Sequence, residues 1–241
     1  MISKSEIKSI TQLQQKKYRD QRNVFVAEGP KVITELLNEG LIIESFFSTE
    51  DTHMLKESHR QISSQQLQKI SSLKTANVAL AVFEKPNPLP FEHSGLTVAL
   101  DAVRDPGNLG TIIRLCDWFG VKHLLCSEDT ADCYNPKVVQ ATMGSIARVS
   151  VHYLDLEQVI HETTLPVFGA FMEGTSVYAT PLPEEGILVM GNEANGISEA
   201  LSNLVQKKIS IPQFGMQSTE SLNVATATAI LLSEFRRSIG R

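Results

Sequence analysis

The sequence predicts an α/β protein of two domains: a small N-terminal α/β domain and a larger C-terminal domain with a mostly parallel sheet covered by helices on both faces. Apolar runs alternate with segments of helical periodicity along the whole chain. In the second part these runs are continuously apolar, which is typical of strands buried on both sides. The three prolines of Pro86–Pro90 can continue neither a helix nor a central strand, so the boundary is expected there, between residues 1–90 and 91–241.

In the N-terminal domain, three runs of apolar and β-branched residues are expected to form strands. They are Asn23–Ala27, Ile42–Phe47 and Val78–Phe83. Two helices separate them: Pro30–Leu37, which has a proline in its first turn, and Ser64–Ser71. This order of strands and helices indicates an α/β module.

In the C-terminal domain the alternation is more regular. The expected strands are Leu96–Leu100, His123–Cys126, Arg148–Val151, Val167–Phe171, Ile187–Met190 and Lys208–Ile211. The expected helices are Leu109–Phe119, Pro136–Met143, Leu156–Thr163, a short helix from Ser198, and Ser221–Arg237. The last helix is apolar on nearly every side, so we expect it to be buried.

The charge balance differs between the whole chain and its start. A formal net charge of −5 argues mildly against non-specific binding of nucleic acid, which depends on neutralising phosphates. Residues 1–31, however, hold seven Lys and Arg side chains against three acidic ones. A solvated first helix and a phosphate-contacting surface both explain this run.

The cysteines and the apolar runs exclude several classes of protein. Cys116, Cys126 and Cys133 form no CxxC pair and have no matching His spacing, so we expect free thiols and neither a zinc site nor a disulfide framework. No run reaches the roughly 20 apolar residues that cross a bilayer, and no apolar leader is present. We therefore expect a cytoplasmic protein with no membrane partner.

The first candidate site follows the strand Leu96–Leu100. Asp105-Pro106-Gly107-Asn108 is expected to be a turn in which Asn108 caps the next helix. Arg114 lies off the apolar stripe of that helix, one turn after Gly110, where a missing side chain leaves room for a ligand. A surface arginine is usually only solvated, but the carboxyl end of a parallel strand is where α/β proteins bind ligands.

The second candidate site is the loop from Gly191 to Ser198, in which Gly191 and Gly196 flank Asn192 and Glu193. An ordinary loop with Ser198 as a helix cap is the simple explanation. The loop lacks the Lys-Ser/Thr of a phosphate-cradling loop and the glycine spacing of a dinucleotide fingerprint. Because Glu193 would repel phosphates, a nucleoside triphosphate is disfavoured, whereas a cofactor with a positive charge and a ribose is not.

The third candidate site follows the strand that ends in Ile211-Pro212. A loop over residues 213–220 leads to Ser221, a plausible helix cap. Asn223 in the first turn is less expected, because Asn is a poor helix former and mostly apolar residues follow. Polar groups at the start of a buried helix would line an internal crevice.

These three motifs together resemble one family. Residues 96–241 resemble the catalytic domain of the SpoU-type RNA ribose 2′-O-methyltransferases of the SPOUT superfamily, with motifs at Asn108–Gly120, Val189–Ile197 and Ile209–Ala229. Asn135–Val151 is also similar to the stretch that links the motifs in that family. Residues 1–90, through Val24–Lys31, resemble the ribosomal-protein-like substrate-binding domain often joined to these enzymes.

The resemblance implies a fold and a cofactor that composition alone could not reveal. The chain from about Ile187 onward would form a deep trefoil knot that binds S-adenosylmethionine, with active sites at a homodimer interface and no metal. The implied cofactor-binding residues are Phe171, Glu173, Gly174, Gly191, Asn192, Gly196, Ile211, Met216 and Leu222. The implied catalytic residues are Asn108, Arg114, Glu193, Ser221 and Asn223.

The expected activity is therefore methyl transfer from S-adenosylmethionine to a ribose 2′-hydroxyl in structured RNA. Arg114 is either the base or a clamp for an RNA phosphate. We expect ribosomal RNA rather than tRNA; a tRNA enzyme and a non-catalytic RNA-binding protein are the alternatives. An oxidoreductase is disfavoured, because no GxGxxG follows the first strand of the domain. RNA-contacting side chains are expected at Lys16, Lys17, Arg19, Arg22 and Lys31.

Overall fold

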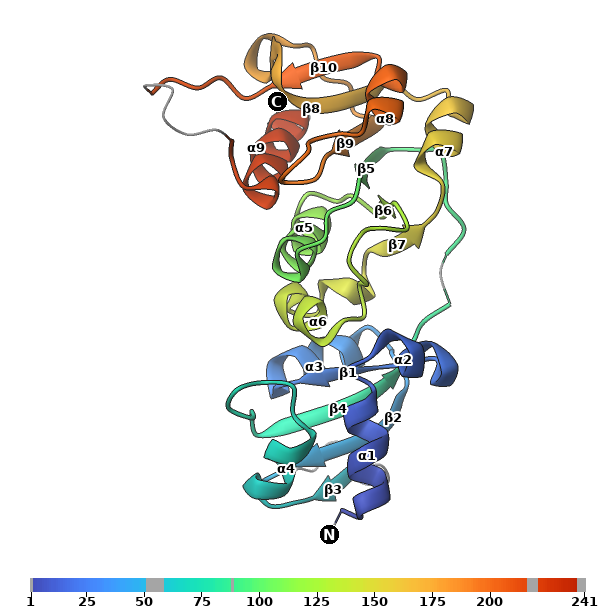
Figure 1. The fold of residues 1–241 in the computed structure, drawn as a ribbon, viewed down its shortest axis with the longest axis vertical. Coiled ribbons are helices and arrows are strands. Elements are labelled where there is room, and N and C mark those ends of the chain that lie inside the picture. The colour runs from blue at the N-terminus through green and yellow to red at the C-terminus, as the bar shows by residue number, and fades with distance from the viewer. Residues whose placement is uncertain (1, 51–58, 88, 216–220, 238–241) are drawn as a thin grey trace. The chain divides into compact units, whose positions relative to one another are not determined.

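The computed structural model describes residues 2–50, 59–87, 89–215 and 221–237. The chain divides into two compact units, drawn together in Figure 1. Unit 1 comprises Met1–Asn87 and Asp132–Arg148, and unit 2 comprises Pro88–Ala131 and Val149–Arg241. The first break falls between Asn87 and Pro88, within the proline-rich segment. The segment Asp132–Arg148, however, packs with the N-terminal residues and not with the C-terminal domain in which the sequence placed it.

Unit 1 is built on a four-stranded sheet of order β1-β4-β2-β3. Pairs β1–β4 and β2–β4 are antiparallel, and only β2–β3 is parallel. The elements are α1 Lys4–Gln12, α2 Lys16–Arg22, β1 Val24–Glu28, α3 Pro30–Asn38, β2 Ile43–Ser48, β3 His59–Gln61, α4 Ser64–Ile70, β4 Ala79–Glu84, α6 Pro136–Thr142 and the 3-10 turn η1 Ser145–Ala147. The sequence analysis did not assign α1, α2 and β3.

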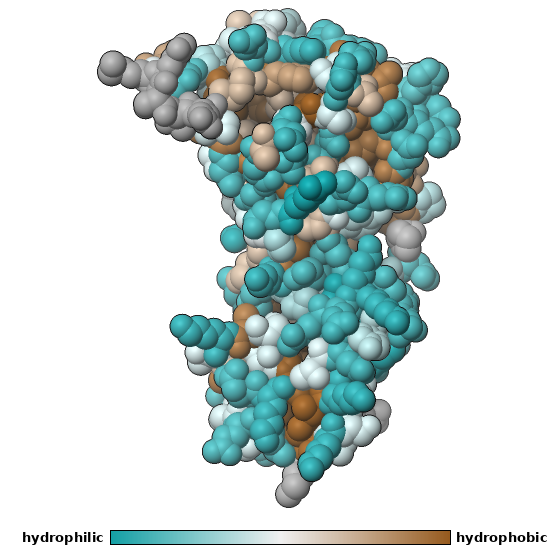
Figure 2. Space-filling view, in the orientation of Figure 1, coloured by the Kyte–Doolittle hydropathy of each residue, from teal (hydrophilic) through white to brown (hydrophobic). Residues whose placement is uncertain are grey.

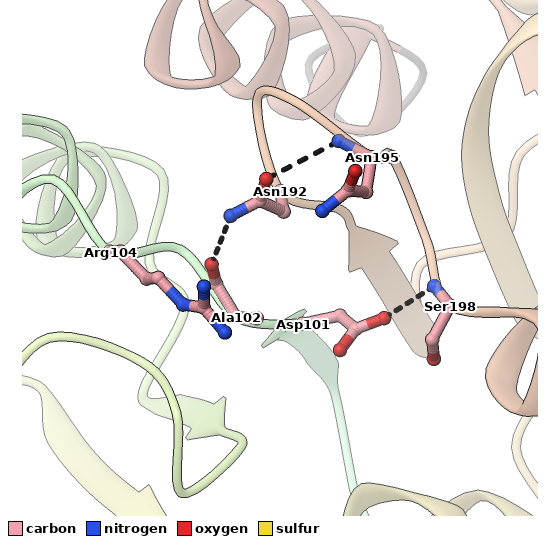
Figure 3. A pocket seen from close by; sticks show the side chains of 7 residues that line it. Asp101, Ala102, Arg104, Asn192, Asn195 and Ser198 are labelled. Carbon is pink, nitrogen blue, oxygen red and sulfur yellow. Dashed lines mark hydrogen bonds between the residues drawn. The ribbon is translucent and has the colours of Figure 1, made fainter.

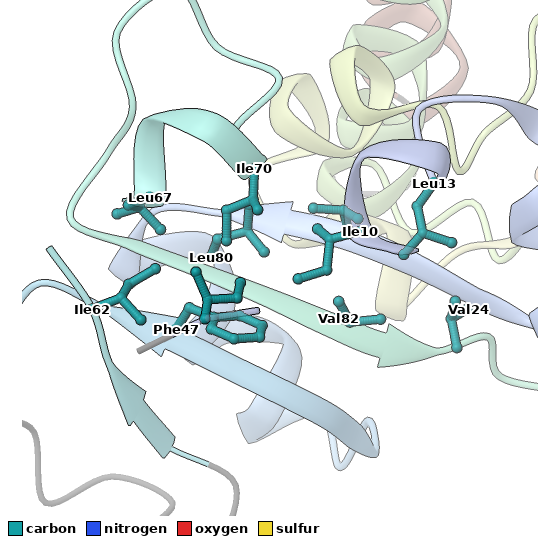
Figure 4. Close-up of a cluster of buried hydrophobic side chains, with 11 residues drawn as sticks. Ile10, Leu13, Val24, Phe47, Ile62, Leu67, Ile70, Leu80 and Val82 are labelled. Atoms are coloured by element: carbon teal, nitrogen blue, oxygen red, sulfur yellow. The ribbon is translucent and has the colours of Figure 1, made fainter. Parts of the chain in front are cut away.

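One hydrophobic core of unit 1 lies between the sheet and the helices α1 and α4. Figure 4 shows its buried side chains, which come from α1, the strands and α4. They are Ile2, Ile10, Leu13, Val24, Val26, Phe47, Ile62, Leu67, Ile70, Leu80 and Val82. Both helices begin with a capping box, in which Ser3 pairs with Glu6 and Ser63 with Gln66.

The segment Asp132–Arg148 is held in unit 1 by contacts on β1 and on α3. Helix α6 packs on β1, and the ring of Tyr134 lies 5.0 Å from that of Phe25. The Arg148 guanidinium bonds the carboxylates of Glu35 and Glu39 on or beside α3. Because these partners are more than 100 residues apart in the chain, local sequence patterns could not reveal the pairing.

Unit 2 is built on a six-stranded sheet of order β10-β8-β9-β5-β6-β7, and every pair in it is parallel. This confirms the predicted parallel sheet. The elements are β5 Leu96–Leu100, α5 Pro106–Trp118, β6 His123–Cys126, β7 Ser150–Tyr153, α7 Leu156–Glu162, β8 Val167–Ser176, the 3-10 turn η2 Val177–Ala179, β9 Gly186–Met190, α8 Glu199–Leu204, β10 Lys207–Ser210 and α9 Val224–Arg237.

Helices cover the two faces of this sheet in pairs. Helices α5 and α9 pack together on one side and α7 and α8 on the other, as Figure 1 shows. The buried residues of α9 are Val224, Ala225, Thr228, Leu231, Leu232 and Phe235, which form one face. Thr226 and Ser233 on the opposite face are exposed. The expected burial of α9 is therefore confirmed for one face of the helix and not for the opposite face.

The hydropathy of the surface and the length of the helices are two further features of the molecule. Hydrophilic side chains cover most of the face in Figure 2, and hydrophobic ones show over β8 and β10 and beside α8. Among the described residues, no helix is long and apolar enough to cross a membrane.

Candidate active site

A cavity of about 1160 Å³ lies in unit 2 at the carboxyl ends of β9, β10 and the middle of β8. Since all strands are parallel, the loops that leave these strands meet at one edge of the sheet. The lining comes from four segments, residues 170–173, 190–197, 208–215 and 221–231. Two of the three predicted motifs thus line one cavity.

The first motif reaches the cavity through a chain of hydrogen bonds. The Asn108 Nδ2 group donates to Glu193 Oε1 at 2.5 Å, and Asn223 Nδ2 donates to Asn108 Oδ1 at 2.9 Å. Each amide is thereby oriented by the next one. Since Glu193 lines the cavity, the structure joins one predicted catalytic residue from each motif at its edge.

Asn223 also begins the last helix. Its Oδ1 accepts the main-chain N–H groups of Ala225 at 3.0 Å and Thr226 at 3.2 Å. Helix α9 starts at Val224, so Asn223 and not Ser221 is its N-cap. The predicted cap at Ser221 is therefore wrong; Ser221 lines the cavity instead.

The cap of α5 also differs from the prediction. Helix α5 begins at Pro106, and Asp105 Oδ1 accepts the N–H of Asn108 at 2.8 Å. Asp105 and not Asn108 is the N-cap. The side chain of Asn108 is therefore free of capping and available to Glu193 and Asn223.

The loop after β9 is a tight turn closed by its own backbone. Asn192 and Gly196 exchange main-chain hydrogen bonds of 2.9 and 2.8 Å, and Asn192 Oδ1 accepts the N–H of Ala194 at 2.8 Å. A Cβ on Gly191 would lie 2.1 Å from the Gly196 carbonyl carbon. Gly191 is thus required by the approach of the two backbone strands, independently of any ligand.

Two further contacts anchor this loop to the end of β5, as Figure 3 shows. Asn192 Nδ2 donates to the carbonyl of Ala102 at 2.6 Å, and the N–H of Ser198 donates to Asp101 Oδ2 at 2.6 Å. Ser198 precedes α8, as predicted, but its side chain makes no capping hydrogen bond. These contacts hold the loops after β5 and β9 together.

Most of the predicted cofactor-binding residues line the cavity. They are Phe171, Glu173, Gly191, Asn192, Gly196, Ile211 and Leu222. Gly174 lies next to it, with its carbonyl accepting from Ser210 Oγ at 3.0 Å. Met216 lies outside the described residues. Met172, within the loop Phe171–Gly174 that the resemblance implied, lines the cavity as well. The sequence analysis missed Lys208, for which the alternation of side chains along an edge strand was a signal.

Arg114 stands apart from this cavity. It is exposed on α5 and is not among the lining residues, and no described residue bonds its guanidinium. Gly110, one turn earlier, is buried and also does not line the cavity, so its predicted role in leaving room for a ligand is not supported. On the same helix, burial raises the pKa of the Cys116 thiol far above its usual range, which argues against a nucleophilic role.

The predicted RNA-contacting residues of unit 1 fall into two groups. Lys16, Lys17 and Lys31 are exposed. Arg19 is only 1% exposed and bonds Asp132 and the Leu13 carbonyl, so the structure does not support it as an RNA contact. Arg22 is paired with Glu44 and Ser9.

Taken together, a parallel sheet with a large cavity at its carboxyl edge, lined by glycines, carboxylates and apolar side chains, defines an α/β protein that binds a nucleoside-like ligand. Among the described residues, no cluster of three or more His, Cys, Asp or Glu side chains could hold a metal.

Comparison with known proteins identifies the family. The chain belongs to the SpoU rRNA methylase family, whose model matches residues 95–233, and residues 4–85 match an MRM3-like substrate-binding domain. This confirms the resemblance predicted from the motifs.

Three relatives match nearly the whole chain. It is 29% identical over 240 residues to the 23S rRNA (guanosine(2553)-2′-O)-methyltransferase RlmP of Bacillus subtilis, covering 96% of both chains. A structure from Porphyromonas gingivalis, assigned to the TrmH family of RNA methyltransferases, is 38% identical, with a TM-score of 0.88 and 99% of both chains covered. An S-adenosylmethionine-bound rRNA methyltransferase from Sinorhizobium meliloti is 29% identical, with a TM-score of 0.86 and coverage of 99% and 97%.

Proposed function

We propose that this protein transfers a methyl group from S-adenosylmethionine to a ribose 2′-hydroxyl of ribosomal RNA. The observation that carries this proposal is the hydrogen-bonded chain from Asn223 through Asn108 to Glu193 at the edge of the cavity. A purely structural loop has no need of three polar side chains from three separate motifs in one network. The named function of the Bacillus subtilis relative is of the same kind.

The cavity fits the proposed cofactor. Its volume of about 1160 Å³ exceeds that of most small-ligand pockets, roughly 300–1000 Å³, and so leaves room for an incoming nucleotide. Ile211 and Leu222 offer apolar surface for an adenine ring, and the carboxylates of Glu173 and Glu193 favour a ligand with positive charge over a phosphate. When bound, the cofactor supplies a methyl group activated by its positively charged sulfur.

The residues of the chain would then position the ribose and stabilise its oxygen. A 2′-hydroxyl is a poor nucleophile and must lose its proton as it attacks. A guanidinium stays protonated in proteins, so we assign Arg114 to clamp an RNA phosphate and to stabilise the developing alkoxide. Asn108 is hydrogen-bonded to Glu193 and Asn223. It would hold the start of α5 and the loop after β9 at a fixed distance from each other during this step.

The position of Arg114 supports a homodimer. Trp118, one turn further along α5, is 83% exposed, and Leu115 lies half-buried between the two. An exposed tryptophan beside a partly apolar helix face suits a surface that a second copy covers. We therefore propose that two copies pair through α5 and α9, so that Arg114 meets the RNA at the interface.

The topology agrees with a deep trefoil knot formed by the chain from about Ile187 onward. In the sheet, β9 lies between β8 and β5, and β10 returns to the far side of β8. The proposed knot rests on membership of the SpoU family together with this order of strands in the sheet. Tracing the path of residues 187–237 in an experimental structure would decide it.

The RNA is expected to contact unit 1 through its exposed lysines. Replacing Lys17 and Lys31 together with Gln should weaken RNA binding and make the affinity less dependent on salt. A cytoplasmic location is proposed as well, since Cys116, Cys126 and Cys133 are buried and form no disulfide bond with one another.

The proposal is tested by mapping ribose 2′-O-methylation on total RNA from cells with and without the gene. One ribosomal RNA site should lose its methyl group, and wild-type protein but not Arg114→Ala should restore it. Loss of a tRNA methyl group instead would favour a tRNA enzyme. No change in any RNA, together with RNA binding by the purified protein, would favour a non-catalytic RNA-binding role.

A further inference from the structure

Lys208 is the only basic side chain among the described residues that line the cavity. Its ammonium lies 4.7 Å from the centre of the Phe171 ring, a cation–π contact. It makes no ion pair with any described acidic residue. At an exposed site a cation–π contact orients a lysine without neutralising it. The charge of Lys208 therefore remains available to a ligand.

An irregularity in β8 places Lys208 among the cavity residues. Lys208 pairs with Gly169, whereas the next residue, Ile209, pairs with Thr175. The residues between, Ala170–Gly174, have no partner in β10 and form an excursion whose side chains Phe171, Met172 and Glu173 line the cavity.

The end of the excursion is fixed against Lys208. A Cβ on Gly174 would lie 2.8 Å from the Lys208 carbonyl oxygen, so the two backbones are in close contact there. Lys208, Phe171 and Glu173 are thus gathered at one end of the cavity by the main-chain path. This placement does not depend on the flexibility of a lysine side chain.

The charges at this end match one part of the proposed cofactor. The amino-acid part of S-adenosylmethionine carries a carboxylate and an ammonium, whereas its adenosine part carries no charge. We propose that Lys208 binds the α-carboxylate of the cofactor, with Glu173 facing the α-ammonium and Phe171 holding Lys208 in place. This inference rests on the proposed function, and it adds a residue outside the three motifs.

The test compares two cofactor products by titration calorimetry. S-adenosylhomocysteine has the amino-acid part, and 5′-methylthioadenosine lacks it. In Lys208→Gln, the Kd for S-adenosylhomocysteine should rise roughly tenfold, as for loss of a hydrogen bond between charged groups, while the Kd for 5′-methylthioadenosine should change less than about twofold. Lys207→Gln is the matched control, because Lys207 lies over Phe168 and does not line the cavity; it should leave both affinities unchanged.

Each other outcome overturns the assignment. Equal weakening of both ligands would mean that Lys208 supports the cavity structurally. Unchanged affinity for both ligands, with weaker RNA binding, would make Lys208 a phosphate contact. If the wild-type protein bound neither ligand, the proposed function would fail; if it bound both and Lys208→Gln did not discriminate between them, only the role of Lys208 would fail.

Discussion

The two units use their polar side chains differently. In unit 1 the two arginines near the chain start are engaged by the fold, since Arg19 bonds Asp132 and Arg22 bonds Glu44, whereas Lys17 and Lys31 are exposed. In unit 2 the polar residues of the motifs bond one another at the edge of a cavity.

The difference follows from topology. Side chains after parallel strands must meet at one edge of the sheet, wherever they lie in the sequence. The mostly antiparallel sheet of unit 1 does not bring the ends of its strands to one edge. Whether a basic residue there is paired or exposed therefore depends on residues that are distant in the sequence. A charge run is therefore a weak functional signal, and polar loops after parallel strands are a strong one. The experiments below test this contrast, in order of decreasing effect.

Arg114→Ala should have the largest effect, because its exposed guanidinium is committed to no described partner. We expect methyl transfer to fall by about a thousandfold, roughly 4 kcal/mol of barrier. The Kd for S-adenosylmethionine should change only a few-fold, since Arg114 does not line the cavity. Turnover by single-turnover assay and Kd by calorimetry give the two values; near-normal turnover would contradict the assignment.

Arg19→Met tests the opposite case, a basic residue used for stability. Removing it leaves the largely buried Asp132 without its partner, so the free energy of unfolding should drop by about 3 kcal/mol. Arg22→Met is the control: it breaks a partly exposed pair and should cost less than about 1 kcal/mol. Urea denaturation measures both. Similar small losses in the two variants would show that burial does not distinguish these arginines.

Gly191→Ala should damage the cofactor site through the backbone alone. The added Cβ has no room beside the Gly196 carbonyl, so the loop must open. We expect the Kd for S-adenosylmethionine to rise at least roughly thirtyfold, about 2 kcal/mol. Gly215→Ala, in the same cavity but with open space at its Cβ, should bind normally. Normal binding of S-adenosylmethionine by Gly191→Ala would show that the loop after β9 is not part of the cofactor site.

Asn223→Ser separates the two roles of Asn223. Serine is also a good N-cap, so the melting temperature should stay close to that of the wild type. Its hydroxyl is too short to reach Asn108, so turnover should fall by at least roughly tenfold, about 1.4 kcal/mol. Asn223→Ala should lose activity equally and also about 1 kcal/mol of stability. Full activity in Asn223→Ser would reduce this residue to a helix cap.

The smallest effect is expected at a polar pair of unit 2 that belongs to none of the three motifs. His123 Nδ1 and His152 Nε2 lie 3.1 Å apart, both rings beside Phe91. Burial lowers the pKa of both imidazoles; Glu92 opposes and Lys122 adds to this shift at His123. The unfolded chain therefore takes up protons first as the pH falls through about 6.5, and stability is lost there.

The melting temperature should accordingly be lower at pH 5.5 than at pH 7.5. Replacing His123 and His152 together with Gln should reduce this difference. Replacing the exposed His161 with Gln should leave it unchanged. A double variant with the full pH dependence would assign it to other groups.

Much of unit 2 was predictable from sequence, because β5, β6 and β9 are mostly apolar runs and β5 and β6 match their expected bounds. The cavity residues followed from the motifs. The excursion of β8 and the role of Lys208 did not, because they depend on how β10 pairs with β8. The caps at Asp105 and Asn223 were missed because each lies within three residues of another good capping residue, Asn108 or Ser221, and only the backbone conformation decides between them.

In unit 1, the sequence contains a local signal for a helix that the prediction lacks. Ser3 and Glu6 have the spacing of a capping box and could have predicted α1. The burial of Arg19 was beyond any local pattern, since Asp132 lies 113 residues away.

The placement of Asp132–Arg148 in unit 1 limits how this protein can be recombined with its relatives. Between β6 and β7 the chain leaves unit 2, supplies helix α6 to the sheet of unit 1, and then returns. A chimera that exchanges residues 1–87 alone would set a foreign β1 against the buried Val138 and Val139 of α6. Unit 1 is therefore discontinuous in sequence. Exchanging it between relatives requires the transfer of both coding segments, for residues 1–87 and for residues 132–148, from the same relative.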